Sequence, residues 1–294
     1  MSSQPPPPAT TGDAAPKHTG VGKDLIQRGV YKPNPLGTAT FIGLRSLDPL
    51  LQYQILARGW GTSLLTKLGL TVIPLYASGT PVSTMMHETG IRLLDSLNLP
   101  LPRLILLAMA TGSTIKQIFW LTCTSKEEFP PSAAASVSAY NTVVNSLASF
   151  LLISTATSAA LSTPLVTIPG TSLRVSLPTA VGAVMYVIGM ALETVPEIQR
   201  RRFKDAPENK GKICDAGLWG WARHVNYAGY TIWRTGYGIA AGGWTAGAVV
   251  AAWHLWTFAF RSIGLMDEYM SGRYGEKWVQ YKRDVPWMLF PGIY

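Results

Sequence analysis

The sequence predicts an all-α membrane protein, a polytopic helical bundle of about six to seven transmembrane helices. Its 294 residues are 47% hydrophobic and only 14% charged, whereas roughly a quarter of the residues are charged in an average soluble domain. The 10 Trp and 12 Tyr residues are typical of the aromatic belts at the two membrane surfaces. We therefore expect several membrane spans rather than a soluble helical fold.

The net charge of +9 is best explained by a membrane surface. Basic residues cluster beside apolar runs, as the positive-inside rule and an anionic bilayer surface require. We expect membrane lipid, and no nucleic acid, as the partner of this charge. The two cysteines, Cys123 and Cys214, lack the spacing of metal ligands, so the sequence indicates no metal site.

Three regions follow one another along the chain. Residues 1–35 form a tail rich in Pro, Ser, Thr and Gly, which we expect to be disordered. Residues 36–192 hold the N-terminal membrane helices, which we place on the substrate side. Residues 193–294 form a C-terminal region that carries the functional motifs.

The apolar runs give the helices in order. Residues 36–65 mix apolar residues with Arg45, Asp48 and Arg58, which favours an interfacial helix pair or a poor first span. A helix that crosses a bilayer needs about 17–25 residues, and the later runs reach or approach this length. These candidate spans lie at 66–80, 102–124, 134–160, 177–196, 226–240 and 244–264, the last two joined by a turn at Gly242–Gly243.

Polar residues inside the spans are candidates for function, because ionisable groups are costly within a bilayer. Lys116 lies in the second span, close enough to its basic end for the amine to reach the surface. Asn141 and Asn145 share a face of the third span, and we expect them to form hydrogen bonds between helices.

The stretch from Glu193 to Tyr237 organises the C-terminal region. It consists of a helix end, a basic loop and a new helix that begins near Asn226. Residues three or four positions apart share a helical face. The first helix thus presents Glu193, Glu197, Arg201 and Lys204 on one face. The second presents Arg223, Asn226, Tyr230, Trp233 and Tyr237, with Tyr227 and Arg234 on the adjoining face.

Three ordered motifs in residues 193–294 resemble a superfamily of membrane enzymes. GLWGWARHVNYAGY is similar to the signature GLW-x-x-x-RH-x-NY-x-G of the steroid 5-alpha-reductases, the sterol reductases and a large uncharacterised reductase-like branch. The upstream E-x-x-x-E-x-Q-x-x-x-F-K and the tail DEYMSGRYGEKWVQYKRDVPWMLFPGIY resemble the reductases in particular. The isoprenylcysteine and phospholipid methyltransferases carry a similar RHP-x-Y-x-G.

The resemblance implies an NADPH site without a Rossmann unit, and the sequence contains no GxGxxG after a strand. The reductase positions that contact NADPH match Glu197, Arg201, Arg223, His224, Asn226, Tyr227, Asp267, Glu268, Tyr274, Trp278 and Tyr281. Further basic and aromatic groups suited to phosphates and rings are Lys204, Trp233, Arg234 and Tyr237. Asn226 could instead cap its helix. Tyr274, Trp278 and Tyr281 could equally anchor the chain at the membrane surface.

Two departures from the reductase pattern affect the functional expectation. Val225 stands where many relatives have Pro, and Tyr230 replaces the acid that follows NY-x-G. We expect an NADPH-dependent reductase of a carbon–carbon double bond in a lipophilic sterol, steroid or enoyl lipid. The alternatives are an S-adenosylmethionine-dependent methyltransferase, with Glu268 at the cofactor, and a non-catalytic scaffold. The catalytic acid is left open among Tyr53, Glu88 and Tyr140.

The distribution of basic residues predicts an orientation. They crowd before the first span, within 200–223 and after residue 261, and an even number of spans separates these regions. We therefore expect both termini and the 200–225 loop in the cytosol, with the chain in the endoplasmic reticulum membrane. The connections 81–101 and 161–175 would lie on the opposite side.

Overall fold

A computed structural model describes residues 28–74 and 89–294, and almost all of its regular structure is helical. The long helices are α1 (Pro35–Arg58), α4 (Leu101–Phe119), α5 (Pro131–Ile153), α6 (Leu177–Asp205) and α7 (Val225–Thr257). The shorter ones are α2 (Thr62–Lys67), α3 (Arg92–Asp95), α8 (Ile263–Tyr274) and α9 (Glu276–Asp284). The strands β1 (Leu165–Thr167) and β2 (Arg174–Ser176) form an antiparallel hairpin in which Leu165 pairs with Ser176.

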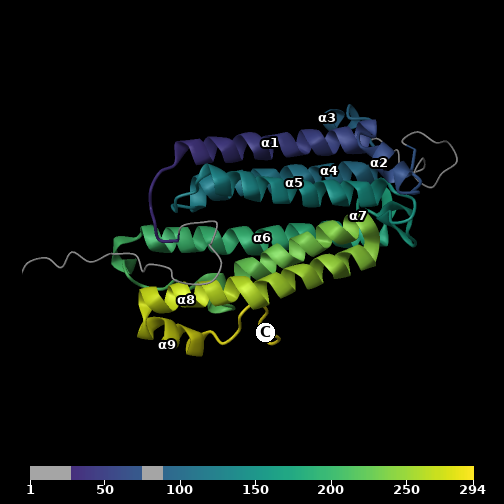
Figure 1. Cartoon of the computed structure of the whole chain (residues 1–294). Coiled ribbons are helices and arrows are strands. Elements are labelled where there is room, and N and C mark those ends of the chain that lie inside the picture. Colours follow the sequence, from purple (N-terminus) through teal and green to yellow (C-terminus); the bar gives the residue numbers. More distant parts are fainter. Residues whose placement is uncertain (1–27, 75–88) are drawn as a thin grey trace, which may run out of the picture.

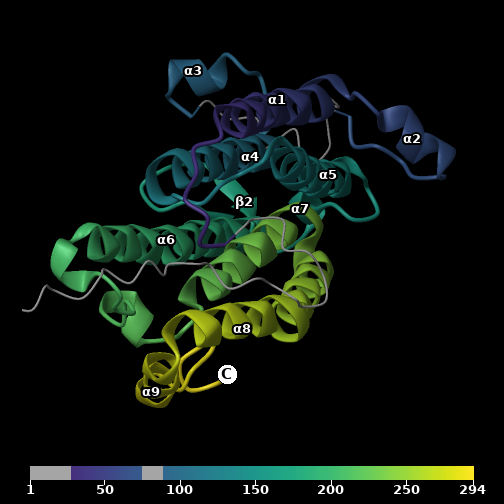
Figure 2. The same ribbon diagram turned by 60° about the vertical axis from the view of Figure 1, so that its left-hand side comes forward.

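The long helices form two layers that run along a common direction (Figure 1). Helices α1, α4 and α5 make one layer, and α6 and α7 make the other, with α8 and α9 beyond them (Figure 2). Among the described residues, four helical segments are long and apolar enough to cross a membrane: 101–124, 131–153, 177–205 and 225–274. The protein is therefore an all-helical membrane protein, as predicted.

Proline and capping residues fix where the long helices begin. Pro35 and Pro131 occupy the first position of α1 and α5, where the missing N–H group costs nothing. Asn34 caps α1 by accepting a hydrogen bond from the Gly37 amide at 2.9 Å. Ser176 caps α6 in the same way, through the Thr179 amide at 3.3 Å. The predicted spans at 102–124, 134–160 and 177–196 thus coincide with α4, α5 and α6.

Helix α7 folds back on itself at Gly242–Gly243, as the sequence predicts. Gly243 adopts a φ of 69°, a conformation that costs other residues steric strain. The first leg of α7 comprises residues 225–241 and the second leg residues 244–257, which continue through a π-turn into α8. The two legs run in opposite directions (Figure 1) and bring the C-terminal region back to the end of the bundle where α7 begins.

At α1 the structure favours the second of the two predicted alternatives, a poor first span, over an interfacial helix pair. This helix is one continuous member of the bundle, and it buries Arg45, Asp48 and Gln52 against α4 and α5. The first predicted span, 66–80, is not a helix over its described part: α2 ends at Lys67 and residues 68–74 are not helical. Helix α1 can lie in the bundle because its buried charges, Arg45 and Asp48, form an ion pair with each other.

The segments with the most basic residues gather at one end of the bundle. Part of the predicted tail, residues 28–34, lies against the α4–α5 connection, where the Glu128 amide donates to the Val30 carbonyl at 2.8 Å. Lys126 from this connection forms an ion pair with Asp205 at the end of α6. The β-hairpin and α3 lie at the opposite end (Figure 1). This grouping agrees with the predicted sidedness, while the compartment itself stays a prediction.

Candidate functional site

Glu197 on α6 and Asn226 on α7 join the two halves of the predicted site. The Asn226 side-chain amide donates to the Glu197 carboxylate at 2.9 Å, and Arg200 forms an ion pair with the same carboxylate at 2.6 Å. The cap of α7 is His224 rather than Asn226. The capping alternative for Asn226 is therefore wrong, because its side chain bonds across to α6 instead of to its own helix.

Arg201 and Lys204 extend the charged face of α6 toward the membrane surface. Arg201 pairs with Asp205 at 2.7 Å, and the Lys204 amine donates to the Tyr274 hydroxyl at 3.0 Å. Lys204 also lies 5.1 Å from the centre of the Tyr274 ring. These contacts bring the α6 cations together with the predicted tail residue Tyr274.

Arg223 connects the start of α7 with the C-terminal segment, residues 285–294. Its guanidinium donates to the carbonyls of Val285 at 2.7 Å and Pro286 at 3.0 Å. Its backbone amide donates to the Trp287 carbonyl at 3.0 Å. In this structure Arg223 therefore holds the chain that follows α9, a role that its place in the motif did not reveal.

His224 begins an aromatic stack that enters the bundle. Its ring is parallel to that of Tyr227 at 5.2 Å, and Tyr227 is parallel to Phe258 on the returning chain at 4.6 Å. Burial lowers the pKa of His224 to about 4, so the ring is neutral at pH 7. His224 itself is 4% exposed, so the half-buried Tyr227 is the part of the stack that is open to a planar ring.

The burial of His224 predicts a pH dependence of stability. Between pH 6.5 and 4 the unfolded chain binds a proton at this histidine that the folded protein does not. The free energy of unfolding should therefore fall as the pH drops through this window, by roughly 2–4 kcal/mol in total. Unfolding in detergent at pH 7 and pH 4 should show a smaller loss for His224→Gln than for the wild type. Equal losses in the two proteins would contradict this prediction.

Trp233, Arg234 and Tyr237 lie deeper, in the interior of the bundle. The Trp233 indole donates to Glu193 of α6 at 2.6 Å. Arg234 is 1% exposed and donates to Asn145 of α5 at 3.0 Å, and also to Asn141. The structure therefore divides the predicted residues into two groups. The inner group consists of Trp233, Arg234 and Tyr237. The outer group, at the end of the bundle, consists of Glu197, Arg201, Lys204, Arg223, His224, Asn226, Tyr227, Asp267, Glu268, Tyr274, Trp278 and Tyr281.

The remaining predicted residues belong to the outer group. Asp267 accepts hydrogen bonds from the Trp278 indole at 2.7 Å and the Lys282 amine at 3.1 Å. The Tyr281 hydroxyl donates to the Trp219 carbonyl at 2.7 Å. Trp278 and Tyr281 are thus buried and bonded within the protein, whereas Glu268 is exposed on α8.

Arg234 of the inner group belongs to a buried polar network that the sequence analysis did not find. Asp48 of α1 accepts from Arg45 at 3.2 Å and from Asn145 at 2.6 Å, and Asn145 accepts from Arg234. The Gln117 amide donates to Asn141 at 2.8 Å, which confirms that the two asparagines bond between helices. A signal was present: Arg45, Asp48 and Gln52 recur at helical spacing.

Lys116 pairs with Glu193 between α4 and α6 rather than reaching only toward the membrane surface. Because Glu193 also accepts from the Trp233 indole, this ion pair joins three helices. Beside it lies an apolar groove of about 460 Å³. The groove is lined by Gly112, Ile115, Lys116, Phe119, Met190, Ala191, Thr194 and Val195.

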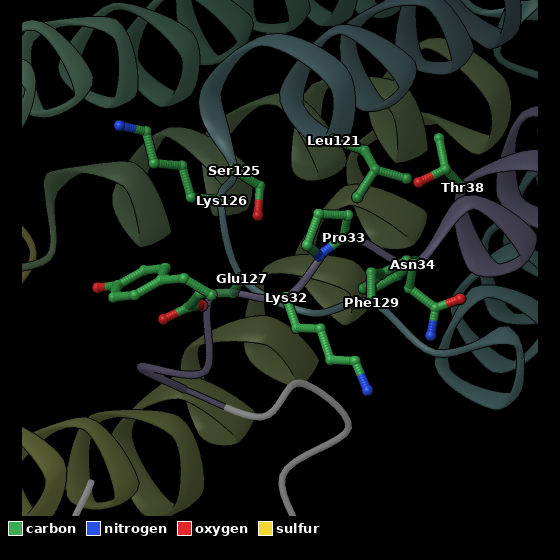
Figure 3. A pocket seen from close by; sticks show the side chains of 10 residues that line it. Lys32, Pro33, Asn34, Thr38, Leu121, Ser125, Lys126, Glu127 and Phe129 are labelled. Atoms are coloured by element: carbon green, nitrogen blue, oxygen red, sulfur yellow. The ribbon is translucent and has the colours of Figure 1, made fainter. Parts of the chain in front are cut away.

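A pocket of about 260 Å³ lies at the basic end of the bundle (Figure 3). Its walls come from the segment before α1 and from the α4–α5 connection: Tyr31, Lys32, Pro33, Asn34, Thr38, Leu121, Ser125, Lys126, Glu127 and Phe129. Figure 3 shows the Lys32 and Lys126 amines pointing to different sides. The pocket therefore does not aim both charges at one ligand.

A sequence-family profile described as "Protein of unknown function (DUF1295)" matches residues 134–285, which include α5 to α9 and both groups of the site. The chain belongs to the DUF1295 family. The match confirms the predicted resemblance to the steroid 5-alpha-reductase-like branch, because related sterol reductases are also found.

Two kinds of relative are similar to this DUF1295 protein. A protein of Ustilaginoidea virens named "Probable O-methyltransferase ustE" is 34% identical, over 85% of this chain and 84% of the relative. The "Delta(14)-sterol reductase" of Neurospora crassa is 28% identical, over 39% of this chain and 32% of the relative. The protein of the same name from Methylotuvimicrobium alcaliphilum is 32% identical, over 28% of this chain and 19% of the relative. The chain thus spans about a third or less of these two reductases.

Proposed function

We propose that this protein is a membrane-embedded, NADPH-dependent reductase of a carbon–carbon double bond in a lipophilic substrate, such as a sterol, steroid or enoyl lipid. The relationship to sterol reductases supports a reductase-like enzyme. The finer assignment rests on the charge of the segments around the outer group, which favours NADPH over S-adenosylmethionine.

The two segments that surround the outer group carry an excess of positive charge. Residues 197–223 contain seven Lys or Arg against four Asp or Glu, and residues 261–294 contain five against four. NADPH carries several negative phosphate charges, which Arg and Lys bind well. S-adenosylmethionine carries a sulfonium cation and one carboxylate, so an excess of cations favours it less. This balance is the observation that carries the proposal.

The residues of the outer group fit an anionic dinucleotide. Arg201 and Lys204 would bind phosphates, and the His224–Tyr227 stack would lie against a planar ring. Asn226 and Glu197 would hold α6 and α7 in register for this binding. When bound, NADPH supplies a hydride to the substrate. The side chains orient the reactants and exclude water.

Direct binding tests this assignment. The purified wild-type protein in detergent should bind NADPH more tightly than S-adenosylmethionine in equilibrium titrations. Asn226→Ala should weaken NADPH binding, because it removes the Asn226–Glu197 hydrogen bond that holds α6 and α7 in register. A hydrogen bond to a charged group is worth about 1.5–3 kcal/mol, so the affinity should fall by at most roughly 10- to 150-fold.

Asn209→Ala is the matched control, since its amide donates only to the nearby Phe203 carbonyl at 3.1 Å. This variant should bind NADPH like the wild type. A folded Asn226→Ala protein with unchanged affinity would remove Asn226 from the site.

A methyltransferase is the second candidate, and the name of the Ustilaginoidea virens relative favours it. Preferential binding of S-adenosylmethionine by the wild type would replace the reductase with this candidate. Binding of neither cofactor would favour a non-catalytic scaffold. The presence of Tyr230, where the reductases have an acid, also favours a scaffold.

A further inference from the structure

Two tyrosines and a histidine meet where α5 packs against both legs of α7. The Tyr140 hydroxyl of α5 lies 3.2 Å from Nε2 of His254 on the second leg. The ring of Tyr230 on the first leg lies 5.3 Å from the His254 ring, and its hydroxyl accepts from Arg234 at 3.2 Å. We call Tyr140, Tyr230, Arg234 and His254 the tyrosine cluster.

The hydrogen bonds of His254 fix the direction of the Tyr140 contact. Nδ1 of His254 lies 2.7 Å from the Val250 carbonyl, and a carbonyl can only accept. Nδ1 therefore carries the hydrogen, and in the neutral ring Nε2 is left as an acceptor. It follows that the Tyr140 hydroxyl donates to Nε2, so its proton is held at a defined position.

Tyr140 is the member of the cluster that a ligand can reach. It is 39% exposed, whereas Arg234 is 1% and His254 5% exposed. The surface beside it on α5 and on the second leg is apolar, with Val143, Leu147 and Trp253 all more than half exposed. In a bilayer this surface faces lipid, so a lipophilic molecule can approach the Tyr140 hydroxyl from the membrane.

The cluster also adjoins the predicted cofactor residues. Tyr227 stacks on Phe258, and the Phe258 ring lies 5.8 Å from that of Tyr230. Tyr227 and Tyr230 are three residues apart, about 4.5 Å along the helix axis. A ring that lies against the His224–Tyr227 stack would therefore be close to the tyrosine cluster.

We propose that Tyr140 is the catalytic acid that protonates the substrate, with His254 and Tyr230 as positioning residues, and that the substrate reaches it laterally from the membrane. This proposal rests on the proposed reductase function. The hydride from NADPH forms one C–H bond at the double bond, leaving NADP⁺. The O–H bond of Tyr140 breaks, its proton forms the other C–H bond, and the phenolate regains a proton from solvent.

The structure separates Tyr140 from the other acids considered. Tyr53 lies on α1, which packs mainly against α4 and α5. Glu88 lies outside the described residues. Tyr230 stands at the position where the reductases have an acid, but its hydroxyl accepts a hydrogen bond from Arg234.

The test compares Tyr140→Phe with the wild type. NADPH affinity should be unchanged, because Tyr140 does not belong to the outer group. NADPH-dependent reduction of a steroid enone and of a trans-2-enoyl ester, used as probes, should fall about 10²- to 10⁴-fold, the usual contribution of a general acid. Tyr186→Phe is the matched control: it removes a buried hydroxyl that donates to the Met109 carbonyl at 2.7 Å, and it should keep the wild-type rate.

A second readout needs no turnover. In ¹⁵N-histidine-labelled protein, the Nε2 signal assigned to His254 should shift in Tyr140→Phe and not in Tyr186→Phe. An unshifted signal, or wild-type reduction rates in Tyr140→Phe, would overturn the proposal while NADPH binding keeps the reductase function. Failure of the wild type to bind NADPH would overturn the reductase function itself.

Discussion

Asp48→Ala is expected to lower the free energy of unfolding by about 3–5 kcal/mol, the usual cost of breaking a buried ion pair from one side. Asp48 is 1% exposed and is bonded to Arg45, Asn145 and Gln52. Its removal would leave the Arg45 guanidinium, 0% exposed, without a counter-charge. Arg234 would add a second buried cation to the same network.

Thermal unfolding in detergent, followed by circular dichroism, measures this loss. Asp205→Ala is the control, since Asp205 pairs with Lys126 where both side chains are more than 40% exposed. Such an exposed pair is screened by water, so its loss should change the melting temperature little. Replacing both Arg45 and Asp48 by apolar residues should restore part of the loss, because Arg45 is then no longer a buried cation without its acid, although Arg234 remains in the network. Equal melting temperatures for the two single variants would refute the network's role.

The same network explains why α1 was hard to predict. A hydropathy reading counts Arg45 and Asp48 as two costs, whereas in the bundle the two form an ion pair, and Thr114 and Asn145 add further hydrogen bonds to them. The partners lie up to 97 residues away in sequence, and no local pattern contains them. The runs that became α4, α5 and α6 carry few charges, so apolar length alone predicted them.

The candidate site divides in a similar way. Helical spacing correctly placed Glu197 on α6 and Asn226 on α7, but their mutual hydrogen bond depends on how the two helices pack. Arg223 could not be linked to Val285 and Pro286, because that contact depends on the path of the chain after α9. Helical spacing also grouped Arg234 with the outer residues. Arg234 is, however, seven or more positions further along α7 than those residues, which places it about 10 Å or more deeper in the bundle.

The contact between α6 and α7 depends on four glycines that the sequence analysis did not single out. Gly182 and Gly189 of α6 face Gly236 and Gly229 of α7, and the two glycines of each helix are seven positions apart. A Cβ atom at Gly189 would lie 2.3 Å from the Trp233 amide nitrogen and 2.7 Å from the Gly229 carbonyl oxygen. Small residues allow such close helix approach in membranes. Here they bring Glu193 to Trp233 and Glu197 to Asn226.

Gly189→Leu should therefore force α6 and α7 apart. Both nearest atoms are backbone and cannot rotate away, so we expect a loss of about 3 kcal/mol or more, at or above the upper end of the usual cost of overpacking. Gly43→Leu is the control, because a Cβ at Gly43 on α1 meets nothing within 4 Å, and its melting temperature should stay near that of the wild type. Because the site is built across this contact, Gly189→Leu should also weaken NADPH binding in protein that remains folded. A Gly189→Leu protein that melts and binds like Gly43→Leu would show that the close approach of α6 and α7 does not hold the site together.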